Sequence, residues 1–533
     1  MTQAPPAEPS YEIYRPERTP HGPPPGDRVV RPSREHRVRG LRKVLGVGAL
    51  YSIGYGYLGS SIYYALGIIA VYALGATPLA LAAAGLLFGF TALTYAEGST
   101  MIPEAGGASA FARRGLNDLA SFVAGWALML DYIVIIAISA LTVPSYLAYF
   151  FPSLKRSHEA ATWVAVGVII VLMALNVVGV RATSGVTLLF CALDILTQAA
   201  LLIVGAFLLL NFKTLIGYAQ GGGWGTWPAS DAFVYSVSIG MVAYIGLESV
   251  SQMAAEARDA ARSLPRSLLL AVASAVVIYA GISMVALSAM RPQDLATQWF
   301  SDPVAGVASH LPTVEFRSHA VSLRLALNEL MAPWVAVLAA SILTMATNAG
   351  ILGVSRLAFS MGAHHQLPAP LVRLHGTFRT PHIAIVFFSI VAMVLLFPSF
   401  YTPDTVLFLG DLYAFGAMLA FTFAHASIIS LRFREPDLPR PFRAWGNIPV
   451  AGRQVPVTAI LGFLSTLAVW VVVVVTHRWG RIVGFVWLVA GTAVYCGYRR
   501  RRGFPLVARV QPETLRPPGA AAAPPTPGGL APS

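Results

Sequence analysis

The stretch SIGYGYLGSSIYYALG, residues 52–67, places three glycines (Gly54, Gly56 and Gly59) and the serines that follow them in an apolar segment long enough to span a bilayer. In hydrocarbon an unsatisfied backbone N–H or C=O is costly, so a helix unwinds there only where protein, a cavity or a ligand satisfies the freed groups. Glycine also allows membrane helices to pack closely. The stretch therefore indicates either an interrupted helix that binds a ligand or a tightly packed one.

Composition places the chain among polytopic membrane proteins. Of its 533 residues, 56% are hydrophobic and only 11% are charged, and the mean hydropathy is +0.65. This is too little charge to cover a soluble globule of that length. The two cysteines, Cys191 and Cys496, both lie in apolar segments, so no disulfide framework is expected. The first 36 residues are rich in Pro and Arg without an apolar core, which argues against a cleavable signal peptide.

Apolar runs of about 20 residues predict twelve membrane-spanning helices. They begin near Gly46, Thr77, Leu119, Thr162, Val186, Phe233, Leu268, Pro333, Ile383, Thr405, Thr458 and Ile482. An even number of spans puts both termini on one side. The loops and termini on that side hold 29 of the Lys and Arg residues, and the opposite loops hold 8. The positive-inside rule then predicts that both termini are cytoplasmic, in the plasma (inner) membrane.

The chain divides into three predicted regions: a basic, Pro-rich arm (1–43), a transmembrane domain (44–500) and a disordered Pro/Ala/Gly-rich tail (501–533). The net charge of +13 is spread over one membrane face and no nucleic-acid recognition motif accompanies it. We therefore expect no nucleic-acid partner. The arm either contacts anionic lipid headgroups or only fixes topology.

A second interruption is predicted in the sixth span, SIGMVAYIGLESVSQMAAE, residues 238–256. Gly240 and Gly246 lie in an apolar run that ends on Glu248 and Glu256. Interruptions in spans one and six are typical of a five-plus-five inverted repeat, in which the two broken helices form the substrate site at the bilayer midplane. Close packing of glycine is the alternative for either segment alone.

Several motifs, in order, resemble the amino acid–polyamine–organocation (APC) permeases. The segment 59–63 is similar to the family's GSGIF-type motif, and four further stretches match its loops and sixth helix: IPEAGGASAFARRGL (102–116), YIGLE with EARDAARSLPRS (244–248 and 256–267), SRLAFSMGAHHQLP (355–368) and LRFREPDLPRPFR (431–443). The resemblance covers about residues 40 to 500. It implies an all-α, LeuT-like fold with broken helices 1 and 6, and secondary transport of amino acids or related amines.

The same resemblance implies a substrate site on the two broken helices. The predicted binding residues are Gly56, Gly59, Ser60, Ser61, Ile62, Ala243, Tyr244, Ile245 and Gly246. Amide groups near Gly59 would bind a carboxylate, helped by the positive end of the next half-helix, and carbonyls of the sixth helix would bind an ammonium. Alternatively, the Ser60 and Ser61 hydroxyls bond back to a preceding carbonyl. Ser61 departs from the family, which often has glycine there.

Three carboxylates inside spans are candidates for handling the coupling ion, since intramembrane ionisable groups are usually functional. Asp194 falls where many proton-coupled members of the family carry a lysine, and it either takes up the ion or is a buried carboxyl with a structural partner. Asp131 binds a substrate ammonium or a cation, or only a neighbouring helix. Glu248 is either a latch or a proton relay. For Glu97 a structural contact is favoured over transport, and for Asp411 a solvated or helix-start position.

Other chemistry is not expected. His364, His365 and His375 lack the spacing of a metal site, and no phosphate-binding GxxxxGK[ST] loop is present. The sequence therefore predicts no enzyme, cofactor, metal or ATP drive. The favoured function is proton-coupled symport by alternating access. The alternatives are a potassium-type importer of the same superfamily and a membrane sensor that transports nothing.

Overall fold

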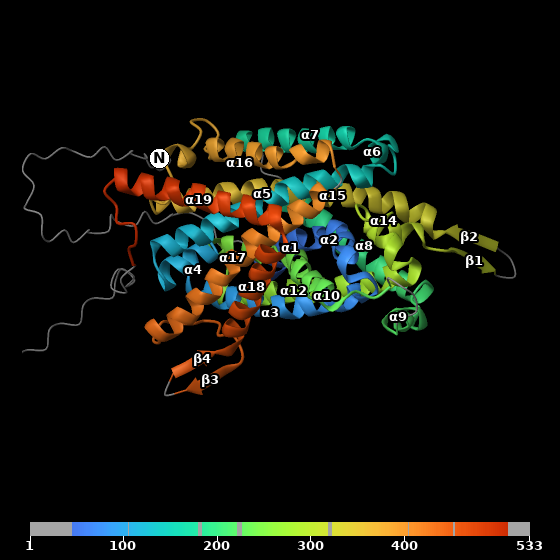
Figure 1. Cartoon of the computed structure of the whole chain (residues 1–533), viewed down its shortest axis with the longest axis horizontal. Coiled ribbons are helices and arrows are strands. Elements are labelled where there is room, and N and C mark those ends of the chain that lie inside the picture. The colour runs from blue at the N-terminus through green and yellow to red at the C-terminus, as the bar shows by residue number, and fades with distance from the viewer. Residues whose placement is uncertain are drawn as a thin grey trace, which may run out of the picture. The chain divides into compact units, whose positions relative to one another are not determined.

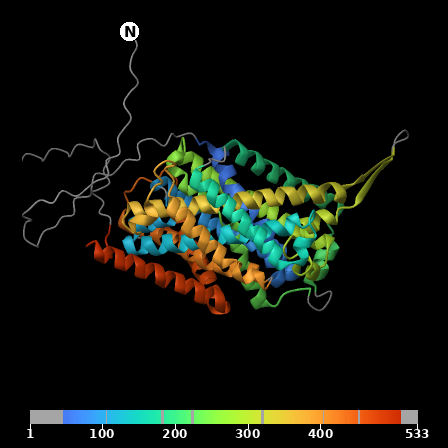
Figure 2. The same ribbon diagram turned by 90° about the horizontal axis from the view of Figure 1, so that it is seen from above.

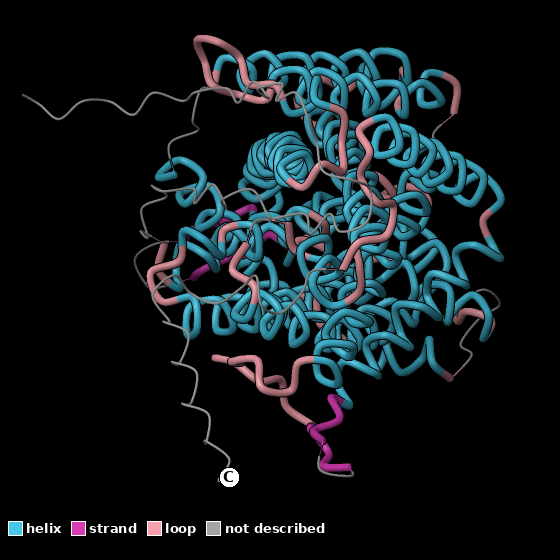
Figure 3. The backbone as a smooth tube through the Cα atoms, turned by 90° about the vertical axis from the view of Figure 1, so that its left-hand side faces the viewer, coloured by secondary structure: helices cyan, strands magenta, loops and turns pink. Residues whose placement is uncertain are grey.

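The computed structural model describes residues 45–509, apart from residues 105, 180–183, 221–225, 318–321, 403 and 451–452. The predicted basic arm and the part of the predicted tail from residue 510 on lie outside the described residues. What is described is mostly helical, as the cyan tube of Figure 3 shows.

Helices of the structure occupy the predicted spans. They are α1 (Val47–Ser60), α2 (Ile62–Ala73), α3 (Thr77–Met101), α5 (Asp118–Leu147), α7 (His158–Val178), α8 (Ser184–Leu208), α10 (Ser230–Gly240), α11 (Leu247–Gln252), α12 (Ala260–Ala289), α15 (Leu327–Ala363), α16 (His382–Leu395), α17 (Thr405–Arg434), α18 (Val457–Thr476) and α19 (Arg478–Arg501). Here α1 with α2, and α10 with α11, are the two halves of predicted spans one and six.

Short elements fill the connections. They are helices α4 (Ala108–Gly115), α6 (Ser153–Arg156), α9 (Phe212–Ala219), α13 (Pro292–Ala296) and α14 (Pro303–Ser309), and 3-10 turns η1 (Leu74–Ala76), η2 (Met241–Tyr244), η3 (Ala254–Glu256), η4 (Ala369–Val372) and η5 (Phe397–Phe400). Two antiparallel hairpins complete the set. β1 (Thr313–Arg317) pairs with β2 (Ser322–Ala326), and β3 (Asn447–Val450) pairs with β4 (Arg453–Pro456).

Successive connections lie at opposite ends of the bundle, as a chain that crosses a membrane repeatedly requires. In Figure 1, α4 and the β3–β4 hairpin lie at one end, and α6, α9, α14 and the β1–β2 hairpin lie at the other. Figure 2 shows the β1–β2 hairpin, in yellow, extending well beyond the helices.

Ten helical segments among the described residues are long and apolar enough to cross a membrane. α16 is apolar but has only 14 residues, and it stops just before η5, where Pro398 cannot continue a helix. α1, also 14 residues long, is not one of the ten, and Ile62–Met101, which runs from α2 through η1 to the end of α3, is a single one of them. The structure thus establishes a multi-pass helical protein, while the count of twelve spans stays a prediction.

Helix starts agree with the predicted starts to within about four residues, except at α15, which begins six residues before Pro333, and at α12. That helix begins at Ala260, eight residues before Leu268, because its first turns are polar and were not part of the apolar run. The Asp259 side chain accepts a hydrogen bond from the Arg262 amide at 3.3 Å and so caps the polar start.

Burial separates a central helix from peripheral ones. In α5, 94% of an apolar stretch of 18 residues is buried inside the protein, whereas in the corresponding stretches of α7 and α19 the share is 22%. Large apolar side chains on the outer helices face outward, among them Phe207 at 86% exposed. Such a surface suits lipid rather than water. α5 is therefore the axis on which the other helices pack.

The chain beyond α19 folds back on the bundle, so the predicted tail starts too early. The Tyr495 hydroxyl donates to the Leu506 carbonyl at 2.8 Å, and the Asp118 amide donates to the Ala508 carbonyl at 2.9 Å. The Phe504 ring stacks on His365, with ring centroids 4.6 Å apart. Residues 502–509 are thus part of the packed domain.

Candidate functional site

The first interruption is smaller than the glycine and serine pattern predicts. α1 ends at Ser60 and α2 begins at Ile62, and Ser61 between them keeps helical dihedrals (φ −67°, ψ −29°). The Ser61 amide donates to the Leu58 carbonyl at 2.9 Å, three residues back instead of four. The helix is therefore tightened and offset at one residue rather than unwound over several.

The two serine hydroxyls have partners within the helix. Ser60 Oγ donates to the Tyr57 carbonyl at 2.8 Å, and Ser61 Oγ lies 3.1 Å from the Tyr64 hydroxyl. For Ser60 the structure thus shows the back-bonding alternative. Both serines are fully buried.

A tyrosine that the sequence reasoning missed contacts this interruption. The Tyr279 hydroxyl, from α12, donates to the Leu58 carbonyl. In an uninterrupted helix that carbonyl would accept from the amide of Ile62, four positions further on. The hydroxyl therefore supplies a donor where the backbone bond is missing.

The second interruption is a true change of backbone direction. The chain passes from α10 through η2 to Ile245, which is extended (φ −67°, ψ 142°), and then to Gly246, with φ at +143°. Residues that carry a Cβ rarely adopt that φ, so this position requires glycine. The helical hydrogen-bond series stops here, which frees backbone carbonyls of the preceding turn. The predicted residues Ala243 and Tyr244 belong to that turn.

Glu248 and Tyr244 hold this second break in place. Glu248 Oε2 accepts a hydrogen bond from the Gly246 amide at 3.1 Å, which caps α11. The Tyr244 hydroxyl donates to the Leu81 carbonyl of α3 at 2.8 Å, so the ring is anchored. Glu248 thus holds the start of α11 at the break, and Tyr244 ties the break to α3.

The two interruptions touch. A Cβ placed on Gly246 would come within 3.1 Å of both the Leu58 amide nitrogen and the Tyr57 Cβ. Only a residue without a side chain allows this approach, a second reason for glycine beside its φ. Segments almost 190 positions apart in the sequence therefore meet at one point inside the bundle.

Asp194, on α8, reaches both sides of the first interruption. The Tyr63 hydroxyl of α2 donates to its Oδ1 at 2.6 Å, and Gln198 Nε2 donates to its Oδ2 at 2.8 Å. Gln198 Nε2 also lies 3.3 Å from the Gly59 carbonyl of α1, as a second acceptor. Asp194 is completely buried. Asp194 therefore joins α8 to α2, and Gln198 joins α8 to α1.

The glycines of α1 serve close packing. A Cβ on Gly59 would lie 2.9 Å from Asp194 Oδ2, and one on Gly54 would lie 2.6 Å from Val250 Cγ2. Gly56 faces Cys191 at 3.8 Å. These positions let α8 and α11 approach the helix closely.

Asp131 lies at the middle of α5 and is completely buried. Neither of its carboxylate oxygens has a hydrogen-bond partner among the described residues. Glu248 is near enough to interact with it electrostatically. Asp131 thus differs from Asp194, whose two oxygens both accept hydrogen bonds.

Comparison with known protein families assigns the chain. Residues 45–496 match the family model described as "Amino acid permease". The chain belongs to the amino acid permease family. It is a multi-pass membrane protein that transports amino acids or related amines.

Named relatives of the permease differ in what they carry. It is 26% identical over 448 residues to the branched-chain amino acid permease BcaP of Bacillus subtilis (strain 168). The matched region covers 79% of this chain and 85% of the relative. It is 27% identical over 381 residues to the glutamate/serine transporter AimA of the same organism (67% and 65%). It is 26% identical over 368 residues to the low-affinity putrescine importer PlaP of Escherichia coli (strain K12) (67% and 73%).

Glu97 lies apart from the interruptions and makes a buried ionic cluster. Arg432 Nη2 lies 2.6 Å from its Oε2, and Arg440 Nε lies 3.7 Å from its Oε1. The Ala444 amide also donates to Oε2, at 2.9 Å. The loop after α17 is thus tied to α3, which is the structural contact favoured for Glu97.

Asp411 is partnered rather than solvated. The Tyr235 hydroxyl donates to Asp411 Oδ1 at 2.7 Å, and His477 Nε2 lies 3.7 Å from Oδ2. Burial lowers the pKa of His477 below its ordinary value. The contact joins α10, α17 and the turn before α19.

The histidine pair lies at the end of α15. His364 Nε2 is 3.2 Å from Arg113 Nη1, and burial together with Arg113 and His365 lowers the pKa of His364 to about 4. His375 lies further along the connection to α16, where its Nδ1 accepts from the Thr377 amide at 3.2 Å. Within the described ranges no three His, Cys, Asp or Glu side chains are grouped as a metal site would need.

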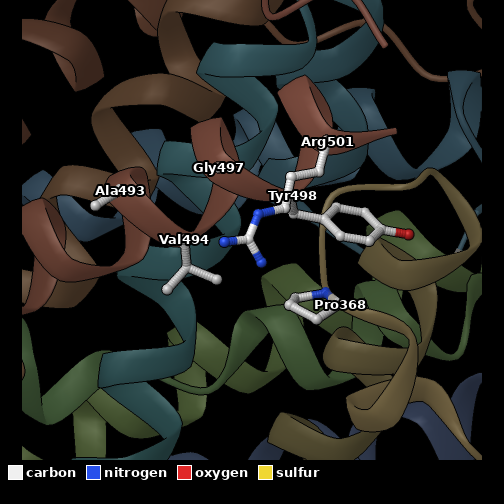
Figure 4. A pocket seen from close by; sticks show the side chains of 6 residues that line it. All are labelled: Pro368, Ala493, Val494, Gly497, Tyr498 and Arg501. Atoms are coloured by element: carbon white, nitrogen blue, oxygen red, sulfur yellow. The ribbon is translucent and has the colours of Figure 1, made fainter. Parts of the chain in front are cut away.

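A surface groove lies far along the chain from the two interruptions. Figure 4 shows its lining: Pro368 and the α19 residues Ala493, Val494, Gly497, Tyr498 and Arg501. None of these residues comes from α1, α2, α10 or α11. The groove is therefore separate from the candidate substrate site.

Proposed function

We propose that the permease is a proton-coupled secondary transporter of amino acids or related amines that works by alternating access. The observation that carries this proposal is the contact between the two interruptions, at Leu58 and Gly246. Broken helices that meet at mid-membrane are the usual substrate site of transporters built from inverted repeats. We infer twelve spans with a five-plus-five repeat, in which the first and sixth rock against the rest.

The substrate would lie between the two breaks. Its carboxylate would face the start of α2, near Gly59, Ser60 and Ser61, where a helix N-terminus favours negative charge. Its ammonium would face the carbonyls of Ala243, Tyr244 and Ile245. The named relatives, which carry amino acids or putrescine, support this substrate class.

Asp194 is the proposed site of the coupling proton. As a carboxylate it accepts hydrogen bonds from Tyr63 and Gln198. A protonated carboxyl carries one donor and so has one fewer accepting position. Protonation would weaken a bond that joins α8 to the start of α2, which is how proton uptake would be felt at the first interruption.

The distribution of basic residues supports cytoplasmic termini in the cell membrane. The 29 Lys and Arg residues on one side, against 8 on the other, give this orientation by the positive-inside rule. Labelling of introduced cysteines on intact cells tests this orientation. The two variants are Lys155→Cys, in a predicted outer loop, and Arg258→Cys, in a predicted inner loop. Labelling of the Arg258 position alone by an impermeant reagent would contradict the orientation.

The test of function is uptake into proteoliposomes that hold the purified chain. We expect accumulation of an amino acid or amine that rises with an inward proton gradient. Asp194→Asn should abolish the accumulation but keep exchange across the membrane. Tyr63→Phe, which keeps the carboxylate but removes the bond to α2 that protonation would weaken, should also uncouple uptake from the proton gradient.

Three results would contradict the proposal. Concentrative, pH-dependent uptake by Asp194→Asn would remove the assigned role of that residue. Rubidium flux without amino acid or amine flux would favour an inorganic-cation importer. Binding of amino acids without any flux would favour a sensor.

A further inference from the structure

A cluster of buried oxygen atoms lies beside the two interruptions. Its members, called here the acceptor cluster, are Tyr57 of α1, Tyr95 of α3, Asp131 of α5, Glu248 of α11 and Tyr413 of α17. Four of the five side chains are completely buried, and Tyr57 is 3% exposed. Each of the three tyrosine hydroxyls interacts electrostatically with both carboxylates. Five helices thus direct polar groups to one place.

Most of these atoms have no hydrogen-bond partner in the described part of the chain. This holds for both oxygens of Asp131, for Glu248 Oε1 and for the hydroxyls of Tyr57, Tyr95 and Tyr413. Buried polar groups in proteins are nearly always paired. Six unpaired oxygens in one cluster are therefore a strong departure from an ordinary interior, and they indicate a binding surface.

The chemistry of the cluster selects its ligand. An ionised carboxylate only accepts hydrogen bonds, while an ammonium group has three N–H donors and no acceptor. Phenol rings add faces that attract a cation. Within the described ranges no Lys, Arg or His forms an ion pair with Asp131 or Glu248. Buried carboxylates normally require such a partner.

The position of the cluster connects it to the substrate site. Tyr57 contacts Gly246 at the second break, and Glu248 Oε2 binds the Gly246 amide. A neutral zwitterion would bring a carboxylate of its own close to two acidic groups and would leave their charge uncompensated. A substrate with an excess of positive charge would compensate it.

We propose that Asp131 and Glu248 bind a charged amine group of the substrate, so that the permease prefers diamines and amino acids with a basic side chain over neutral amino acids. The proposal rests on the transport function inferred above and names the substrate class of the same site. Asp131 supplies both free oxygens, and Glu248 supplies one while its other oxygen caps α11.

The test ranks ligands for the full-length chain in detergent and in proteoliposomes. Putrescine and lysine should raise the melting temperature, and should inhibit or drive uptake at concentrations about tenfold or more below those of leucine, the margin expected for hydrogen bonds to a charged group. Binding to the folded state appears directly as such stabilisation.

Variants assign the preference to Asp131. Asp131→Asn should lose the preference for putrescine and lysine while still binding leucine. Asp131→Glu, which keeps the charge, should keep the preference for putrescine and lysine. So should Asp259→Asn, because Asp259 is an exposed carboxylate next to Arg262. If Asp131→Asn does not fold, the ligand ranking of the unaltered chain decides the proposal alone.

The outcomes separate the two proposals. Uptake of leucine equal to or better than that of lysine and putrescine overturns the cationic preference and leaves amino acid transport standing. A preference for cations that Asp131→Asn retains overturns the role of Asp131. Stabilisation by rubidium alone, or no flux of any amine or amino acid, overturns both.

Discussion

Replacing Tyr279 by Phe tests whether the hydroxyl in the first interruption holds the helix together. The ring stays, and only the oxygen that donates to the Leu58 carbonyl is removed. That carbonyl keeps the Ser61 amide as its remaining donor. Loss of one buried hydrogen bond should therefore lower the free energy of unfolding by about 1–1.5 kcal/mol.

Equilibrium unfolding in mixed micelles measures this loss. Every 1.4 kcal/mol changes the ratio of folded to unfolded protein about tenfold. Tyr51→Phe is the matched control, because Tyr51 also joins α1 to α12, through a 3.1 Å bond to Ser274 Oγ, but is partly exposed. The free energy of unfolding lost in Tyr51→Phe should stay below about 1 kcal/mol, because water replaces the lost partner.

Uptake should fall in Tyr279→Phe along with stability, because the interruption is part of the proposed substrate site. Equal destabilisation by Tyr279→Phe and Tyr51→Phe would refute this role of the Tyr279 hydroxyl. Full stability with normal uptake in Tyr279→Phe would show that the hydroxyl does not hold the interruption together.

Three further substitutions have defined outcomes. Gly59→Ala should cost about 1–3 kcal/mol and impair uptake, since its methyl group would lie 2.9 Å from a carboxylate oxygen of α8, whereas Gly48→Ala, with nothing within 4 Å, should be neutral or stabilising in the same unfolding assay. Glu97→Gln should cost about 3–5 kcal/mol because it strands buried arginines, and Glu435→Gln, whose pair is partly exposed, should cost about 1 kcal/mol or less; similar losses for the two would contradict the buried ion pair. His364 has its pKa lowered to about 4 from 6.5, so the unfolded chain binds more protons between those values and the protein should lose stability as the pH falls through that range. The loss is at most about 3 kcal/mol, reduced because the side chain is partly exposed, and His364→Gln should flatten this part of a plot of melting temperature against pH.

The spans and the second interruption were predictable because their signals are local. Apolar length placed most helix starts within a few residues. Gly246 stands where the backbone has φ at +143°, a value that favours glycine in any context. The Glu248 cap lies two residues further, so its contact with the break also follows from sequence proximity.

The first interruption was harder to predict, because glycine in a membrane helix has two uses. Gly54 and Gly59 stay helical and admit neighbouring side chains, and Ser61 keeps helical dihedrals. The residue that contacts the interruption, Tyr279, is 221 residues from Leu58 in the sequence. No local pattern in a single sequence marks such a partner.

The carboxylates also differ in whether their contacts could be predicted from local sequence. Gln198 follows Asp194 by four residues, a spacing that puts both side chains on one face of a helix, so their hydrogen bond was accessible to sequence reasoning. The neighbours of Asp131 come from α1, α3, α11 and α17, and their convergence depends on how the helices pack. Its position in mid-span was visible in the sequence, but its lack of partners was not.

The packing of residues 502–509 has a practical consequence for fusion proteins. A fluorescent reporter joined directly after Arg501 would replace the carbonyls of Leu506 and Ala508 that bind Tyr495 and Asp118. The ends of α5 and α19 would then lose a shared attachment, and poor expression could be mistaken for an unstable transporter. A reporter joined after Arg509 leaves both hydrogen bonds intact.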